Sequence, residues 1–164
     1  MENKKVKFLT KAAVIAALYC VMTLLISPIA FGENQVRISE ALNVLVYFTP
    51  AAIPGLFVGC ILANLSSPFG LIDIACGSMA TLLAGLVASR IKNKYLVEIP
   101  SILFNGFIVA YVLLKMASVP YWAGFVSVCI GQAISLYALG LPLIFIIEKN
   151  KALYSLIADE SIEE

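Results

Sequence analysis

The feature that most constrains this chain is a set of four long apolar runs, at residues 8–27, 71–89, 96–116 and 121–147. A helix needs about 20 apolar residues to cross the hydrocarbon core of a bilayer, and each run is close to or above that length. Of all residues, 62% are hydrophobic and 13% are charged, which fits a multi-span membrane protein and no soluble protein of this size. The net charge of +1 gives no support for nucleic-acid binding.

Several kinds of chemistry lack the residues that they need. The chain has no histidine, which is the commonest proton shuttle and metal ligand. It has no G-x-x-x-x-G-K-[ST] motif, so any ATP-driven transport would need a partner. The cysteines stand singly inside apolar runs and are interpreted as small buried hydrophobic residues: Cys20, Cys60, Cys76 and Cys129. We predict no catalytic residue, no metal and no cofactor, and we expect the first apolar run to be retained rather than cleaved.

The stretch RISEALNVLVYFTPAAIPG, residues 37–55, breaks the apolar pattern with charges and two prolines. It could form one kinked helix or two short ones, at 40–48 and 50–65. A nine-residue α-helix is only about 14 Å long and cannot span about 30 Å of hydrocarbon. Its ends must therefore be buried in protein, and irregular backbone at membrane depth usually lines a cavity. The segment predicts the wall of a binding pocket.

Basic residues decide between these alternatives, because they collect on the cytoplasmic side of membrane proteins. They form three clusters, which are Lys4, Lys5, Lys7 and Lys11, then Arg90, Lys92 and Lys94, then Lys149 and Lys151. An even number of crossings must separate the first two clusters. Two short helices satisfy this rule, as would a re-entrant pair that never crosses, whereas one kinked helix does not.

The predicted fold is an all-α integral membrane protein forming a single domain over residues 1–164. It has six transmembrane helices at about 8–27, 40–48, 50–65, 71–89, 96–116 and 121–147, of which the second and third are short. Both termini are expected in the cytoplasm, and residues 151–164 form a polar, solvated tail.

Polar residues inside membrane segments are costly and usually face a cavity. This topology places seven of them in the outer half of the protein, with an aromatic residue near them that could stack on a ligand. The candidate ligand-binding residues are Arg37, Glu40, Asn43, Asn64, Asp73, Asn105, Trp122 and Gln132. Their convergence on one side of the membrane is the argument for a site.

Each candidate also has a simpler interpretation. Arg37 and Glu40 could form a surface ion pair, and Asp73 could cap a helix. Trp122 could belong to an aromatic belt at the membrane surface, and the amide side chains could be hydrogen-bonded links between helices. Glu98, near the cytoplasmic end of its helix, could favour the helix N-terminus or pair with Lys94.

Small residues on the first apolar run predict a helix-packing face. Ala12 and Ala16 are four residues apart, as are Ala13 and Ala17, so each pair shares a side of the helix. Such residues let another helix approach closely. That helix could belong to a partner or to this same chain.

RISEALNVLVYFTPAAIPGLFVGCILANL, DIACGSMATLLA, EIPSILFNGFIVAY and VCIGQAISLYALGLPL resemble the QueT family of substrate-binding S-components of energy-coupling factor (ECF) transporters. The resemblance runs from Ala12 to Ile147 and is most specific between Arg37 and Asn64. It implies a six-helix protein of a prokaryotic cell membrane that captures a 7-deazaguanine precursor of queuosine. The implied partners are a transmembrane coupling protein, docked on the alanine face, and two cytoplasmic ATPases. One departure is Gln132, where the family usually carries a glutamate.

The implied ligand suits the polar residues. A deazaguanine edge presents N1–H and an exocyclic NH₂ side by side, which one carboxylate can accept together, and Glu40 and Asp73 are candidates. One alternative function is a stand-alone secondary transporter or facilitator for a nucleobase-like solute. The other is an intramembrane enzyme, which the chain lacks the residues to support.

Overall fold

The computed structural model describes residues 2–26 and 37–158 of the chain. This part is helical and contains no strand. In chain order the elements are α1 (Glu2–Leu25), η1 (Ile38–Tyr47), α3 (Ala52–Asn64), α4 (Leu71–Ala88), α5 (Ile99–Ala117), α6 (Tyr121–Ser135), η2 (Leu136–Gly140), α7 (Leu141–Lys149) and α8 (Lys151–Ile157).

Four helical segments of the described chain are long and apolar enough to cross a membrane, at Asn3–Leu25, Leu71–Ala88, Ile99–Ala117 and Tyr121–Lys149. They coincide closely with the four apolar runs of the sequence. Apolar side chains on their outer faces are exposed, including Leu9, Leu71 and Ile130. An all-helical protein with apolar outer faces is the expected form of a chain that lies in lipid. The two other apolar helices, η1 and α3, are shorter.

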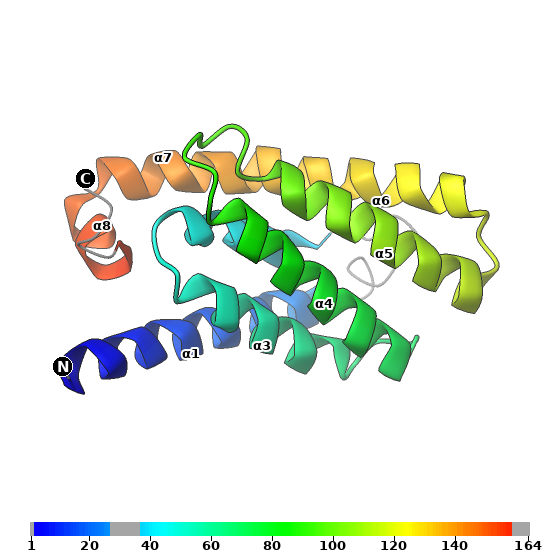
Figure 1. Ribbon diagram of the computed structural model, residues 1–164, viewed down its shortest axis with the longest axis horizontal. Helices are drawn as coiled ribbons and strands as arrows, with labels where there is room; N and C mark the ends of the chain where they lie inside the picture. The colour runs from blue at the N-terminus through cyan, green and yellow to red at the C-terminus, as the bar shows by residue number, and fades with distance from the viewer. Residues whose placement is uncertain (1, 27–36, 159–164) are drawn as a thin grey trace.

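Figure 1 shows how the helices are arranged. α1 and α3 lie side by side along one edge, α5 and α6 lie along the opposite edge, and α4 runs between them. η1 lies in the middle of the bundle, in contact with α1, α3, α4, α6, η2 and α7. Eight of its residues, Ser39 to Val46, are buried. The first part of the segment that breaks the apolar pattern of the sequence, Ser39 to Val46, is therefore enclosed by protein.

η1 is a 3₁₀ helix, whereas the sequence predicted an α-helix at 40–48. A 3₁₀ helix rises about 2.0 Å per residue, so ten residues extend about 20 Å rather than about 15 Å. The chain then turns at Thr49 and Pro50, where the Thr49 Oγ1 accepts a hydrogen bond from the Ala51 N–H at 3.3 Å. α3 begins at Ala52, two residues after the predicted start.

The last apolar run contains an irregularity that the sequence analysis missed. α6 and α7 are joined by the π-helical segment η2. Pro142, in the first turn of α7, lacks an N–H and its ring crowds the carbonyl four residues earlier. A π-helical turn before the proline lets the helix continue past this position, and such turns are frequent at functional sites.

The predicted solvated tail is helical over its first half. The Asn150 Oδ1 caps α8 by accepting hydrogen bonds from the Ala152 and Leu153 N–H groups at 3.1 and 3.3 Å. The Lys11 ammonium, on α1, donates to the Ile157 carbonyl at 3.0 Å. α8 is therefore attached to α1, and residues 159–164 of the predicted tail lie outside the described part.

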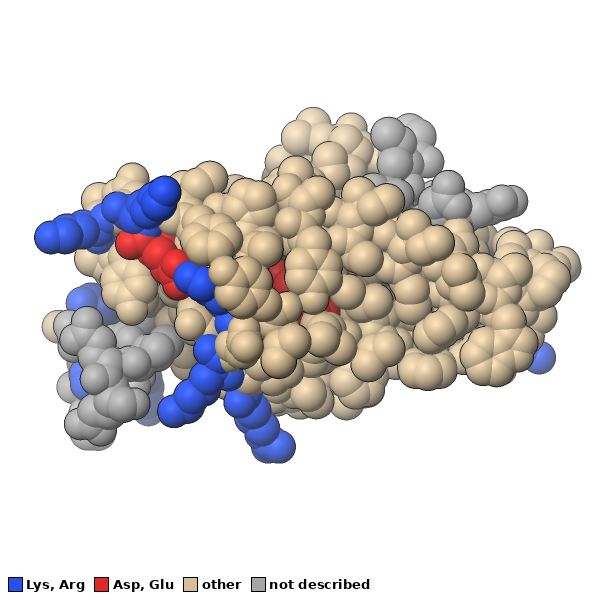
Figure 2. All heavy atoms as spheres, turned by 90° about the horizontal axis from the view of Figure 1, so that it is seen from above, with Lys and Arg blue, Asp and Glu red and all other residues tan. Residues whose placement is uncertain are grey.

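The basic residues gather at one end of the molecule. Figure 1 shows the start of α1, the α4–α5 loop and the α7–α8 junction at the same end. Figure 2 shows most lysine and arginine side chains there, with an isolated one at the opposite end. This arrangement is what the argument from the three clusters requires.

Candidate ligand-binding site

Arg37 and Asp73 form a buried ion pair that joins η1 to α4. The Arg37 Nη2 lies 3.5 Å from the Asp73 Oδ2, and the two side chains are 2% and 0% exposed. The Ser67 hydroxyl donates to the same Oδ2 at 2.6 Å, and the Asn64 Nδ2 donates to the Asp73 carbonyl at 3.1 Å. Because Arg37 and Glu40 are both buried, the simpler alternative of a surface ion pair between them is wrong.

Glu40 lies in the core and is held by two donors. The Tyr19 hydroxyl donates to Oε1 at 2.5 Å, and the Asn43 Nδ2 donates to Oε2 at 2.6 Å. The same Asn43 Nδ2 lies 3.3 Å from the Ser101 Oγ, which links η1 to α5. Each Glu40 oxygen therefore already accepts a hydrogen bond from the protein.

A third group of polar side chains lies where α5 and α6 face η1. On α5, Ser101 and Asn105 are buried, and the Asn105 Nδ2 donates to the Ser101 carbonyl at 3.0 Å. On α6, Gln132 and Ser135 are buried. Glu98, directly before α5, is 0% exposed.

Within the described residues, several buried oxygen atoms have no hydrogen-bond partner. They are Asn64 Oδ1, Asp73 Oδ1, Glu98 Oε1, Glu98 Oε2, Gln132 Oε1 and Ser135 Oγ. The amide oxygens can only accept a hydrogen bond, and so can the carboxyl oxygens when these groups are ionised. The serine hydroxyl can also donate one. Buried polar atoms are nearly always paired, and each exception needs an explanation. Donors from outside the described residues, such as bound water or a ligand with N–H groups, would supply the missing partners.

A comparison with known families bears on this interior. The model of the QueT transporter family matches residues 9–149. The chain belongs to the QueT transporter family. This confirms the resemblance noted in the sequence, and the matched range includes all eight candidate ligand-binding residues.

One relative of this QueT-family chain is the "Queuosine precursor transporter QueT" of Lactococcus lactis subsp. cremoris (strain MG1363). The two sequences are 33% identical over 101 residues, which cover 58% of this chain and 59% of the relative. The matched part thus spans less than two thirds of the relative's length. No solved structure matches the chain.

Trp122 does not lie with the other candidates of the QueT-family chain. It is 68% exposed, and its ring contacts Tyr121 and Phe125 edge-on at 5.4 and 5.9 Å. Its ring therefore lies at the surface of the protein, whereas the other seven candidates are buried. Its position agrees with the alternative of an aromatic belt.

The alanine face is divided between two environments. A Cβ added at Gly55 or Gly59 of α3 would lie 2.8 Å from the carbonyl oxygen of Ala12 or Ala16, respectively. These two alanines therefore pack α1 against α3 inside this chain, as the simpler interpretation held. Ala13 and Ala17 are exposed on α1.

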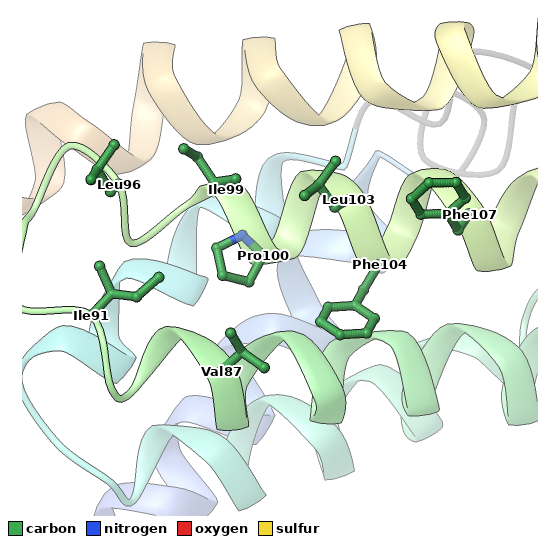
Figure 3. Close-up of a pocket in the computed structure, with 8 residues that line it drawn as sticks. All are labelled: Val87, Ile91, Leu96, Ile99, Pro100, Leu103, Phe104 and Phe107. Atoms are coloured by element: carbon green, nitrogen blue, oxygen red, sulfur yellow. The ribbon is translucent and has the colours of Figure 1, made fainter.

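A hollow of about 540 Å³ lies between α4 and α5. Figure 3 shows its lining, which consists of Val87, Ile91, Leu96, Ile99, Pro100, Leu103, Phe104 and Phe107. Ligand sites combine an apolar lining with a few polar groups that fix orientation, and this hollow has an apolar lining only. None of the predicted site residues lines it.

Three buried polar residues were not predicted from the sequence: Tyr19, Ser101 and Ser135. Tyr19 was detectable, because Ala12, Ala16, Tyr19 and Thr23 follow the helical spacing of a single face. The two serines are short polar residues inside apolar runs, and serines there often bond only to their own helix.

Proposed function

We propose that this chain is the substrate-binding S-component of an ECF-type transporter and binds a queuosine precursor with a 7-deazaguanine base. Membership in a transporter family and the name of the Lactococcus relative support transport of such a precursor. The chain itself is a non-catalytic subunit of the cell membrane, and its energy comes from a transmembrane coupling protein and two cytoplasmic ATPases.

The observation that carries the proposal is the set of buried acceptors without partners. A 7-deazaguanine base offers N–H donors at its N1, 2-amino and pyrrole positions. Hydrogen bonds to ionised acceptors contribute about 1.5–3 kcal/mol each, so two such bonds support binding at low concentration. The acceptors lie on α3, α4 and α6 and directly before α5, in the bundle that surrounds η1.

We propose that the six apolar helices all cross the membrane, with both termini and the three basic clusters in the cytoplasm. The short η1 needs no contact with lipid, because protein surrounds it. The buried acceptors then open toward the outside in the state that captures the ligand. The coupling protein docks on α1 beside the exposed Ala13 and Ala17.

Uptake by reconstituted proteoliposomes tests this proposal. Vesicles would contain this chain with the coupling protein and both ATPases from the same genome, and uptake of radiolabelled 7-aminomethyl-7-deazaguanine would be followed with ATP or with a non-hydrolysable analogue inside. We expect accumulation only with ATP and only when all four subunits are present. Uptake by the chain alone would instead identify a secondary transporter or facilitator and overturn the S-component assignment.

A further inference from the structure

Glu98 is a buried carboxylate that neither the family match nor the ion pairs of the bundle explain. It lies at the start of α5, and its side chain makes no capping hydrogen bond there. Lys94, the cation predicted to pair with it, lies 2.8 Å from the Glu148 carboxylate instead. The predicted pairing with Lys94 is therefore wrong, and the position of Glu98 at the N-terminus of α5 leaves its side-chain oxygens without a capping hydrogen bond.

Glu98 differs from the two other buried carboxylates of the described chain. Glu40 accepts hydrogen bonds on both oxygens, and Asp73 accepts on one oxygen that also faces Arg37. Both oxygens of Glu98 lack a partner among the described residues, although its side chain is 0% exposed. A carboxylate in an apolar interior is costly unless donors or a cation reach it.

The backbone around Glu98 leaves room for its carboxylate. A Cβ added at Gly140, the last residue of η2, would lie 2.9 Å from the Glu98 Oε1 and 2.8 Å from the Val44 Cγ1. Only glycine therefore fits at this position without a shift of its neighbours. The π-helical segment, the glycine and the unpaired carboxylate thus occur together, at the level of Ala41 and Val44 of η1.

The neighbouring polar groups face the same interior. Ser101, one turn after Glu98 on α5, lies within 3.3 Å of the Asn43 amide. α6 and the following η2 approach α5 at two points. The Cys129 Sγ lies 3.7 Å from the Ile102 carbonyl, and Gly140 lies beside Glu98. Gln132 and Ser135 lie on the stretch of α6 that these contacts bound, and their unpaired oxygens are acceptors.

We infer that Glu98 is a ligand-binding residue whose two oxygens accept the adjacent N1–H and 2-amino donors of a guanine-type base. This inference rests on the proposed function and names the carboxylate that reads the base edge. A planar pair of N–H donors matches a carboxylate with two free oxygens, whereas Glu40 would have to give up Tyr19 or Asn43 to make the same pair of bonds.

Binding of two probes to the purified chain tests the inference. 7-Deazaguanine carries both donors, and 7-deazahypoxanthine lacks only the 2-amino group. We expect wild type to bind 7-deazaguanine at least tenfold more tightly, because losing one donor leaves a carboxylate oxygen unpaired. In Glu98→Gln the amide nitrogen opposes one of the donors, so this ratio should fall below about threefold. Glu148→Gln, a surface control, should keep the wild-type ratio.

The outcomes separate the inference from the proposed function. If wild type binds neither probe nor any larger precursor, the proposed function fails. If wild type binds 7-deazaguanine but does not discriminate between the probes, or if Glu98→Gln keeps the discrimination, the assignment of Glu98 is wrong. A purely structural role for Glu98 would weaken both probes equally and leave the ratio unchanged. The wild-type comparison needs no variant, so a wild type that does not discriminate between the probes refutes the assignment even if Glu98→Gln does not fold.

Discussion

The bond between Tyr19 and Glu40 should be among the strongest polar contacts between α1 and η1, and a double-mutant cycle measures it. The O–H···O distance of 2.5 Å is at the short end of the range for a hydroxyl donating to a carboxylate. Hydrogen bonds between helices in membrane proteins average about 0.6 kcal/mol in such cycles, with a maximum near 1.7. Because this one is short, buried and charge-assisted, we expect a coupling free energy of about 1.5 kcal/mol.

The cycle compares wild type, Tyr19→Phe, Glu40→Gln and the double variant. The free energy of unfolding would be measured by SDS titration in mixed micelles, with tyrosine and tryptophan fluorescence as the signal. Tyr19→Phe combined with Glu148→Gln, at the surface, serves as the control and should be additive to within about 0.5 kcal/mol. A coupling between Tyr19 and Glu40 no larger than that of the control would show that the short contact contributes nothing specific, and our account of the Glu40 site would fail.

Three further predictions test the packing, the partner face and the topology. Gly59→Ala should destabilise the chain by about 1–3 kcal/mol, because its Cβ would lie 2.8 Å from the α1 backbone. Gly85→Ala, whose Cβ would lie 3.7 Å from its nearest neighbour, should change stability little. Equal effects of the two variants would contradict this packing. Ala17→Trp should block co-purification with the coupling protein while the isolated chain still binds ligand. Ala16→Trp should instead destabilise the isolated chain. Normal assembly of Ala17→Trp with the coupling protein would show that this face is not part of the interface. A single cysteine in place of Asn93, in a chain without its native cysteines, should react with an impermeant thiol reagent only from the cytoplasmic side, and labelling from outside would invert the proposed topology.

The long helices could be predicted because their signal is local. A run of about 20 apolar residues has few alternatives to a membrane-spanning helix, and the four runs appear as helices in the structure. The 3₁₀ form of η1 could not be predicted in this way. It depends on how far the buried segment must extend between its neighbours, which is a property of the whole bundle.

The site could be predicted by residue type but not by pairing. Arg37, Glu40 and Asp73 were identified because charges inside apolar segments are rare. Their partners come from distant segments, such as Tyr19 for Glu40, and sequence spacing carries no information about such contacts. The same limit explains Glu98, which is four residues after Lys94 in the loop but is buried in the structure. It also explains why the sequence could not separate Ala12 and Ala16, which pack against α3, from Ala13 and Ala17, which are exposed.

The measurement that tests the central claim most directly is native mass spectrometry of the purified chain, released from detergent micelles without any partner. We predict that chain taken from cells supplied with a queuosine precursor carries one bound 7-deazaguanine compound per monomer. Added adenine should not displace it, and added 7-aminomethyl-7-deazaguanine should. A chain that carries no such compound, and that acquires none when 7-aminomethyl-7-deazaguanine and queuine are added at saturating concentration, would contradict the account.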